Sequence, residues 1–248
     1  MTRAPAPNSL LRRGEARLAA GDLAGARALL DRAVARDPHN AEGFAARGEV
    51  LRQQGELAAA RADFERALVL RPGYAWALAS RGLTLLQSGD PAAALADLDH
   101  ALASGEDIAW AVLHRGQALA RLGRHAEARA AFEQAVALDG NDLEARLGWA
   151  DAARVLGDLD EALAEYHRIA NAEPGRALPR ARIAEIHHRR GESAAMVAAL
   201  VEVFRLPIQH AEDFFARAIA LRLEGDVSAS AKFMSQARMR GWAGDSAQ

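Results

Sequence analysis

The side chains best suited to metal binding or proton transfer are histidines, and they are scattered along the chain. No two of the eight stand three or four residues apart, the spacing that puts two ligands on one face of a helix. Cysteine is absent from the 248 residues, which excludes disulfides, thiol catalysis and cysteine-ligated zinc. We therefore expect no metal site and no cofactor. The histidines are His39, His100, His114, His125, His167, His187, His188 and His210.

The other residue types that carry out catalysis also lack the required spacing. The glycines are single, so none forms a glycine-rich loop that holds a phosphate, and no Ser-His-Asp set has a local signature. Carboxylates are plentiful, but paired acid and base residues need a pocket, and helical repeats of the kind derived below seldom close one. We therefore expect a protein that is not an enzyme.

One basic cluster is the only charge pattern that suggests nucleic acid. It is confined to residues 176–190, contains no Trp, Tyr or Phe for base stacking, and includes Glu185, which can pair with Arg189 one turn on. The net charge of the chain is only −2, so no global field attracts a polyanion. We expect a solvated helical face and no nucleic-acid partner; salt-dependent retention on a nucleic-acid column would favour the alternative. The cluster comprises Arg176, Arg180, Arg182, His187, His188, Arg189 and Arg190.

The elements that must position any site come from an internal repeat of 34 residues. Glycines recur at this spacing, at Gly21, Gly55, Gly89, Gly123, Gly157, Gly191 and Gly225. The seven units are residues 7–40, 41–74, 75–108, 109–142, 143–176, 177–210 and 211–244. Because a solenoid grows by adding units, we expect a single domain over 7–244, with tails at 1–6 and 245–248.

Each repeat contains two amphipathic segments separated by its recurring glycine. In the second repeat Phe44, Gly48 and Leu51 share one helical face, and three apolar residues share another face after the glycine. A left-handed Gly55 would end the first helix, and Pro72 would stop the second. The small Gly48 lets the two helix backbones approach closely. Each unit is therefore predicted to be a helical hairpin.

These positions resemble the tetratricopeptide repeat, whose 34-residue unit has large apolar residues, small residues and a proline at fixed offsets. The second repeat fills all seven positions, with Phe44, Gly48, Leu51, Ala60, Phe64, Ala67 and Pro72. The later repeats, above all the sixth and seventh, drift from the pattern. The resemblance implies an all-α fold, a right-handed α-solenoid of antiparallel helix hairpins with about fourteen helices. It also implies a non-catalytic protein–protein interaction scaffold that binds a peptide or partner segment in its concave groove.

The resemblance implies that this groove is lined by the face of each first helix that points out of the hairpin. In helical angles that face holds the second, fifth, ninth, twelfth and thirteenth positions, about 130° from the core positions. In the third and fourth repeats it becomes apolar, and Trp76 and Trp110 take the same position in adjacent repeats. We therefore place a peptide-binding site there. Its predicted residues are Trp76, Leu83, Leu86, Gln87, Trp110, Leu113, Gln117, Arg121, Leu147 and Arg154.

The charges of the groove favour the same location. In the second repeat the groove cation Arg52 has a carboxylate, Glu49, one turn back, which is a common helix-stabilising pair. Arg121 has Gln117 in that place and so lacks such a partner. We expect an apolar anchor of the partner to lie on the two tryptophans, with an acidic group or chain terminus near Arg121. The alternative is that either tryptophan tilts into the seam between neighbouring repeats and belongs to the core.

Cellular location and assembly are predicted from what the sequence lacks. No segment has the apolar core of a secretory signal or the length of a membrane helix, so we expect a cytoplasmic protein without membrane insertion. The bias towards alanine and arginine indicates a bacterial gene. The alternative function is a structural role in which the repeats self-associate into a homo-oligomer and the groove is secondary. Light scattering separates this from the monomer expected of a peptide-binding scaffold.

Overall fold

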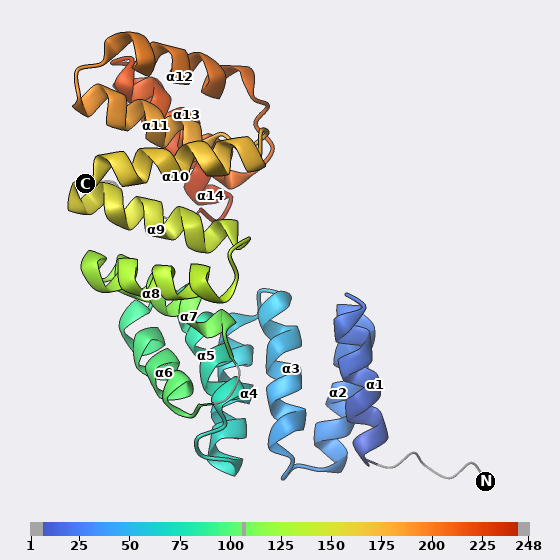
Figure 1. Cartoon of the computed structure of the whole chain (residues 1–248). Coiled ribbons are helices and arrows are strands. Elements are labelled where there is room, and N and C mark those ends of the chain that lie inside the picture. Colours follow the sequence, from blue (N-terminus) through green and yellow to red (C-terminus); the bar gives the residue numbers. More distant parts are fainter. Residues whose placement is uncertain (1–6, 106–107, 243–248) are drawn as a thin grey trace. The chain divides into compact units, whose positions relative to one another are not determined.

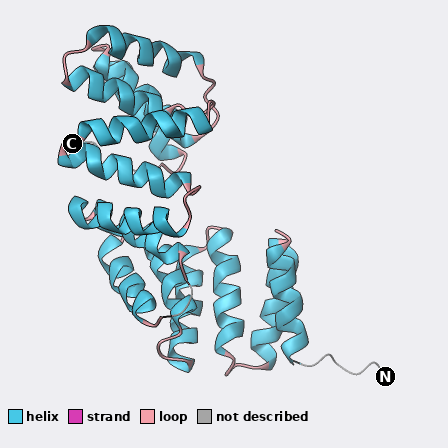
Figure 2. Ribbon diagram, viewed as in Figure 1, coloured by secondary structure: helices cyan, strands magenta, loops and turns pink. Residues whose placement is uncertain are grey.

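The computed structural model describes residues 7–105 and 108–242, and all regular structure in these residues is α-helical (Figures 1 and 2). The described residues form fourteen helices, two for each predicted repeat. The tails predicted at 1–6 and 245–248 lie outside the described residues. The chain divides into two compact units, Met1–Leu122 and Gly123–Gln248. Each is a stretch of α-solenoid built from antiparallel helix hairpins.

The N-terminal unit contains the first three hairpins and the first helix of the fourth. Within the unit successive helices pack against one another, and the first helices of successive repeats (α1, α3, α5 and α7) also contact one another. The first helices therefore lie in a row, which can bring groove positions of adjacent repeats together. The helices are α1 (Pro7–Ala19), α2 (Leu23–Arg36), α3 (Ala41–Gln53), α4 (Leu57–Leu70), α5 (Ala75–Gln87), α6 (Pro91–Ala103) and α7 (Trp110–Arg121).

The C-terminal unit continues the same pattern and departs from it near its end. There α13, besides its hairpin partner α14, packs more against α11 than against α12, and α12 buries only Leu200 and Val203. This departure falls in the repeats whose sequence drifts most from the pattern. The helices are α8 (His125–Leu138), α9 (Leu143–Leu156), α10 (Leu159–Ala172), α11 (Leu178–Arg189), α12 (Ser193–Arg205), α13 (Ala211–Leu223) and α14 (Val227–Met239).

The recurring glycines make the hairpin turns, as predicted. All seven have a positive φ, between 72° and 97°, which is the left-handed region that other residues rarely adopt. At the second turn the Gly55 N–H donates to the Arg52 carbonyl (3.0 Å) and the Glu56 N–H donates to the Leu51 carbonyl (2.9 Å). These bonds satisfy carbonyls that the helix end leaves without a partner and fix the direction in which the next helix leaves.

Close helix approach at small residues is confirmed. A Cβ added to Gly48 would lie 3.0 Å from the ring of Phe64, which is fully buried in the second hairpin. A glycine outside the predicted core positions, Gly148, is tighter still, because its Cβ would lie 2.5 Å from the buried ring of Phe132. The α8–α9 packing therefore depends on the missing side chain at residue 148.

Gly148→Ala is expected to destabilise the C-terminal unit by about 1–3 kcal/mol, because a rigid buried ring must move to admit the methyl group. Alanine's better helix propensity, worth about 1 kcal/mol or less, offsets only part of this. Gly175→Ala, in the turn before α11, is the control for added volume without a clash, since a Cβ there meets nothing within 4 Å. Urea denaturation followed by circular dichroism measures both variants. Equal midpoints would contradict the packing argument.

Candidate functional site

A surface pocket opens on the first helices of the N-terminal unit. Its volume is about 190 Å³, below the roughly 300–1,000 Å³ of pockets that enclose small ligands. This volume suits one or two side chains of a longer segment lying across α3, α5 and α7. We call it the groove pocket, and its lining residues are Glu49, Arg52, Trp76, Ser80, Leu83 and Trp110.

The two tryptophans occupy the same pocket but differ in burial. Trp110 is 37% exposed, and its ring and the ring of His114 pack edge to face with centroids 5.6 Å apart. Trp76 is half-buried and meets the core ring of Phe64 edge-on at 6.2 Å. Trp76 therefore both packs on the core of the second hairpin and lines the pocket, whereas Trp110 is a surface residue. The groove and seam alternatives are both partly true for Trp76.

A charged pair lines one side of the groove pocket. Arg52 Nε donates to Glu49 Oε2 at 2.9 Å, which confirms the pairing predicted from their spacing. Both side chains are largely buried, so the pair is shielded from solvent and held in place. Sequence reasoning treated these two residues only as helix-stabilising and missed them, together with Ser80, as lining residues. Their signal was available, because Glu49 and Arg52 occupy groove positions in the repeat before Trp76.

Other predicted site residues lie on the expected helices at different depths. Leu83 lines the groove pocket, and Leu113 is half-buried on α7. Leu86 is only 2% exposed, so it supports the surface from within. Gln87 is exposed at the end of α5. The oxygen of Gln117 lies 2.9 Å from His114 Nδ1, next to Trp110.

The two predicted residues of the fifth repeat belong to the C-terminal unit. Leu147 and Arg154 are both buried, each 6% exposed. Arg154 Nε lies 3.6 Å from the Asp151 carboxylate, one turn back on α9, as their spacing predicts. Neither residue offers an open surface to a ligand.

Arg121 has no carboxylate partner among the described residues, but one of its guanidinium nitrogens hydrogen-bonds the backbone of α5. In residues 7–105 and 108–242 it has no ion pair, and its Nη1 donates to the Leu86 carbonyl at 2.6 Å. Partial burial lowers the pKa of Arg121, since burial disfavours the charged form. Arg121 is the last residue of α7 and is exposed. Arg121 thus ties the ends of α5 and α7 together and still presents positive charge.

The predicted Glu185–Arg189 pair is wrong. Glu185 is 6% exposed and accepts hydrogen bonds from Arg182 (2.8 Å) and from Arg222, which is 37 residues further on (3.0 Å). Arg189 instead donates to the Arg154 carbonyl at 3.4 Å. Glu185 points into the contact between α11 and α13, where the buried Arg182 and the partly exposed Arg222 hold it in place of Arg189.

Several cations of the basic cluster are neutralised by carboxylates. Arg180 pairs with Glu202 at 3.1 Å, and Arg190 pairs with Asp160 at 2.6 Å. Arg176 contacts three carboxylates. Its guanidinium donates two hydrogen bonds to one of them, that of Glu212. This cluster is therefore a network of ion pairs rather than a patch of open positive charge.

The described residues give no basis for a metal site or a membrane span. Across residues 7–105 and 108–242, no three histidine, aspartate or glutamate side chains gather as metal ligands do. None of the helices described is both long and apolar enough to cross a membrane.

The repeat itself decides the family. A model of the tetratricopeptide repeat matches residues 11–75 and 80–142, which together exceed half of the chain. The chain belongs to the tetratricopeptide repeat (TPR) family. A second TPR model matches residues 119–186. No curated protein matches this TPR protein in sequence.

Solved structures share the TPR fold over most of the chain. A TPR protein from Parabacteroides merdae matches with a TM-score of 0.74 and 21% identity, covering 96% of this chain and 94% of its own. YrrB, described as a TPR protein with an unusual peptide-binding site, has a TM-score of 0.63 and 20% identity, with 82% and 96% covered. PilW, a type IV pilus biogenesis factor, has a TM-score of 0.62 and 18% identity, with 96% and 94% covered. At these identities the likeness shows the fold alone.

Proposed function

We propose that this TPR protein is a non-catalytic scaffold whose N-terminal unit binds a peptide segment of a partner protein in the groove pocket. The observation that carries the proposal is the exposed Trp110 beside Trp76 in one pocket on three successive first helices. Tryptophan is enriched among the residues that dominate binding energy at protein interfaces. The fold supports a scaffold, and YrrB is a neighbour of the same fold described as having a peptide-binding site.

The chemistry of the pocket indicates what its ligand offers. An apolar side chain lying on Trp76, Leu83 and Trp110 would bury indole and leucine surface without leaving polar groups unpaired. The Glu49–Arg52 pair fixes one end of the pocket and can hydrogen-bond a peptide backbone. An acidic group or chain terminus of the segment would lie towards Arg121, which has no carboxylate partner among the described residues.

Selection of random peptides displayed on phage against the full-length protein tests this proposal. We expect enriched peptides to share one large apolar residue with an acidic residue or a free carboxyl terminus a few positions away. Peptides bound at an unrelated surface would keep their affinity for a Leu83→Ser variant. Such peptides would contradict the proposal, because Leu83 is half-buried on the pocket wall and the substitution makes that wall polar.

The proposed scaffold acts as a monomer in a bacterial cytoplasm. Its alanine- and arginine-rich composition supports the bacterial origin. Light scattering over a range of concentrations should give the mass of one 26.5 kDa chain. A stable oligomer would favour the alternative, a self-associating structural protein.

A further inference from the structure

Arginines at one position of the repeat join carboxylates in the N-terminal unit. This position is the seventh of each repeat, and Arg47 there binds Asp63 of its own repeat through Nε (2.7 Å) and Nη2 (2.8 Å). The same guanidinium donates to Asp31 of the preceding repeat at 3.0 Å. Arg47 is therefore flanked by two acidic positions, one in its own second helix and one in the second helix before.

The next two repeats keep parts of this arrangement. Arg81 binds Asp97 of its own repeat through two hydrogen bonds of 2.7 Å. Arg115 donates to Asp99 of the preceding repeat at 2.5 Å. The seventh-position arginine is thus a repeated structural cation whose carboxylates come from the adjacent second helices.

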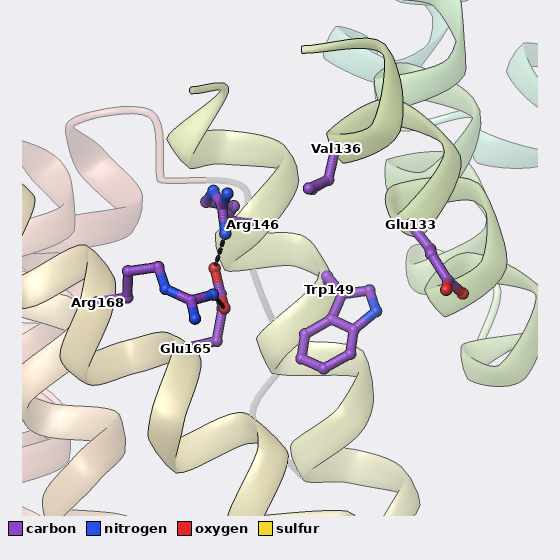
Figure 3. Close-up of a pocket in the computed structure, with 6 residues that line it drawn as sticks. All are labelled: Glu133, Val136, Arg146, Trp149, Glu165 and Arg168. Atoms are coloured by element: carbon purple, nitrogen blue, oxygen red, sulfur yellow. Dashed lines mark hydrogen bonds and ion pairs between the residues drawn. The ribbon is translucent and has the colours of Figure 1, made fainter. Parts of the chain in front are cut away.

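In the fifth repeat both acidic positions remain, but the arginine is replaced by Trp149. Glu133 on α8 and Glu165 on α10 occupy the two acidic positions, and a pocket of about 290 Å³ lies between them. Figure 3 shows the indole of Trp149 between the two carboxylates. We call this the Trp149 pocket, and its lining residues are Glu133, Val136, Arg146, Trp149, Glu165 and Arg168.

Only one of the two carboxylates pairs with other arginines in place of the missing seventh-position arginine. Glu165 binds Arg146 at 2.5 Å and also Arg168, so its charge is neutralised (Figure 3). Glu133 is exposed and has no ion pair within residues 7–105 and 108–242. Both cations of the pocket are held on the Glu165 side, so the Glu133 side keeps an unpaired negative charge beside the indole.

The indole of Trp149 already attracts a guanidinium. Arg129 lies 5.1 Å from the ring centroid and is not among the residues that line the pocket, so pocket-facing indole surface remains open. A tryptophan face is the best aromatic partner for a cation, and the planar guanidinium suits both stacking and a bidentate carboxylate contact. The pocket thus combines an aromatic surface, an apolar wall at Val136 and an unpaired carboxylate.

We propose that the Trp149 pocket binds an arginine side chain presented by a partner protein. The guanidinium lies on the indole of Trp149 and pairs with Glu133, in the place that Arg47 takes between its two carboxylates. The stem of that arginine packs on Val136. This site lies in the C-terminal unit and does not depend on the groove pocket, so either site can fail in experiment without the other.

Nuclear magnetic resonance of the full chain with 15N-labelled tryptophan tests the proposal. The probe is the peptide acetyl-Gly-Gly-Arg-Gly-Gly-amide, compared with the same peptide carrying citrulline, which has the shape of arginine without the charge. We expect a saturable shift of the Trp149 indole signal with the arginine peptide and none with citrulline. Equal shifts with both peptides, or no saturable shift, would overturn the proposal.

Two variants separate the carboxylate from the surface as a whole. Glu133→Gln should weaken binding of the arginine peptide about fivefold, the upper end for a partly exposed ion pair. Glu127→Gln on the same helix is the control, because Glu127 pairs with Arg124 outside the pocket, and its affinity should match wild type. Equal losses in the two variants, or none in Glu133→Gln, would argue against the assigned contact.

A third variant fills the pocket from within. Trp149→Arg restores the cation found at this position in the second, third and fourth repeats, so the arginine peptide should no longer bind by calorimetry. Retained binding would contradict the proposal. A Trp149 signal in wild type that shifts with protein concentration, without peptide, would show a second copy of the chain in the pocket and overturn the assignment to a partner.

Discussion

Glu185→Ala is expected to lower the free energy of unfolding of the C-terminal unit by about 3–5 kcal/mol, the usual effect of removing one partner of a buried ion pair. Glu185 is 6% exposed and lies between Arg182, at 2.8 Å, and Arg222, at 3.0 Å. Arg154 lies 3.9 Å away from the same carboxylate. Without Glu185, the buried guanidinium of Arg182 would lose its nearest buried anion, and at 4% exposure Arg182 gains little compensating hydration.

Chemical denaturation of the full chain measures this effect, with Asp160→Ala as the matched control. Asp160 also binds an arginine, Arg190, but it is exposed, so its loss should cost about 1 kcal/mol or less. A second transition in the denaturation curve would report the C-terminal unit, since repeat arrays need not unfold in one step. Similar losses in the two variants would contradict a buried role for Glu185.

The same carboxylate makes the stability of this unit depend on pH. Burial raises the pKa of Glu185, but Arg182 and Arg154 outweigh it, so the pKa in the folded chain is lowered. A lowered carboxyl pKa contributes stability above the unfolded value, about 4.3, and that contribution is lost as pH falls through the folded value. The stability difference between wild type and Glu185→Gln should therefore be constant near neutral pH and shrink below about pH 4. A difference that grows on acidification would give the shift the opposite sign.

Trp110→Ala is expected to weaken a groove-binding peptide at least about thirtyfold, the effect of losing an interface residue worth about 2 kcal/mol. Because Trp110 is a surface residue, the melting temperature of the Trp110→Ala variant should stay close to that of wild type. Trp76→Ala should weaken the same peptide and also lower the melting temperature, since Trp76 packs on Phe64. The two tryptophans of one pocket thus separate binding from stability.

Val69→Ala is the control for the groove variants. Val69 is an exposed apolar residue on α4 of the same unit and lies outside the groove pocket. We expect its affinity and its melting temperature to match wild type. If Trp110→Ala and Val69→Ala bind the peptide equally well, the groove pocket is not the binding site.

The repeat and its hairpins could be predicted because they depend on local properties. The left-handed backbone at the helix end requires a glycine, Gly55, and the ring of Phe64 requires a residue without a side chain, Gly48, sixteen residues earlier. Both requirements appear in the sequence as residues that recur at a fixed period. The period also indicates which helix face carries Trp76 and Trp110. It does not indicate how deeply each side chain lies, and Leu86, at a groove position, is only 2% exposed.

Long-range pairing is where prediction from spacing failed. Arg189 stands one turn from Glu185, but Glu185 bonds to Arg222 in the next repeat, a contact that depends on how α11 and α13 pack. Trp149 gave a different signal. Its position carries arginine in the three repeats before it, but the meaning of the change required the observed bonds of Arg47 to two carboxylates.

Peptide binding in the groove pocket is tested most directly by the indole N–H spectrum of the full-length protein with and without a peptide selected by phage display. The chain has four tryptophans, at residues 76, 110, 149 and 242, and each gives one indole N–H signal. Two line the groove pocket, Trp149 lines its own pocket, and Trp242 stacks on Phe215. Binding in the groove pocket predicts that the signals of Trp76 and Trp110 shift together and saturate, while those of Trp149 and Trp242 stay in place. A bound peptide that leaves the signals of Trp76 and Trp110 unchanged would contradict it.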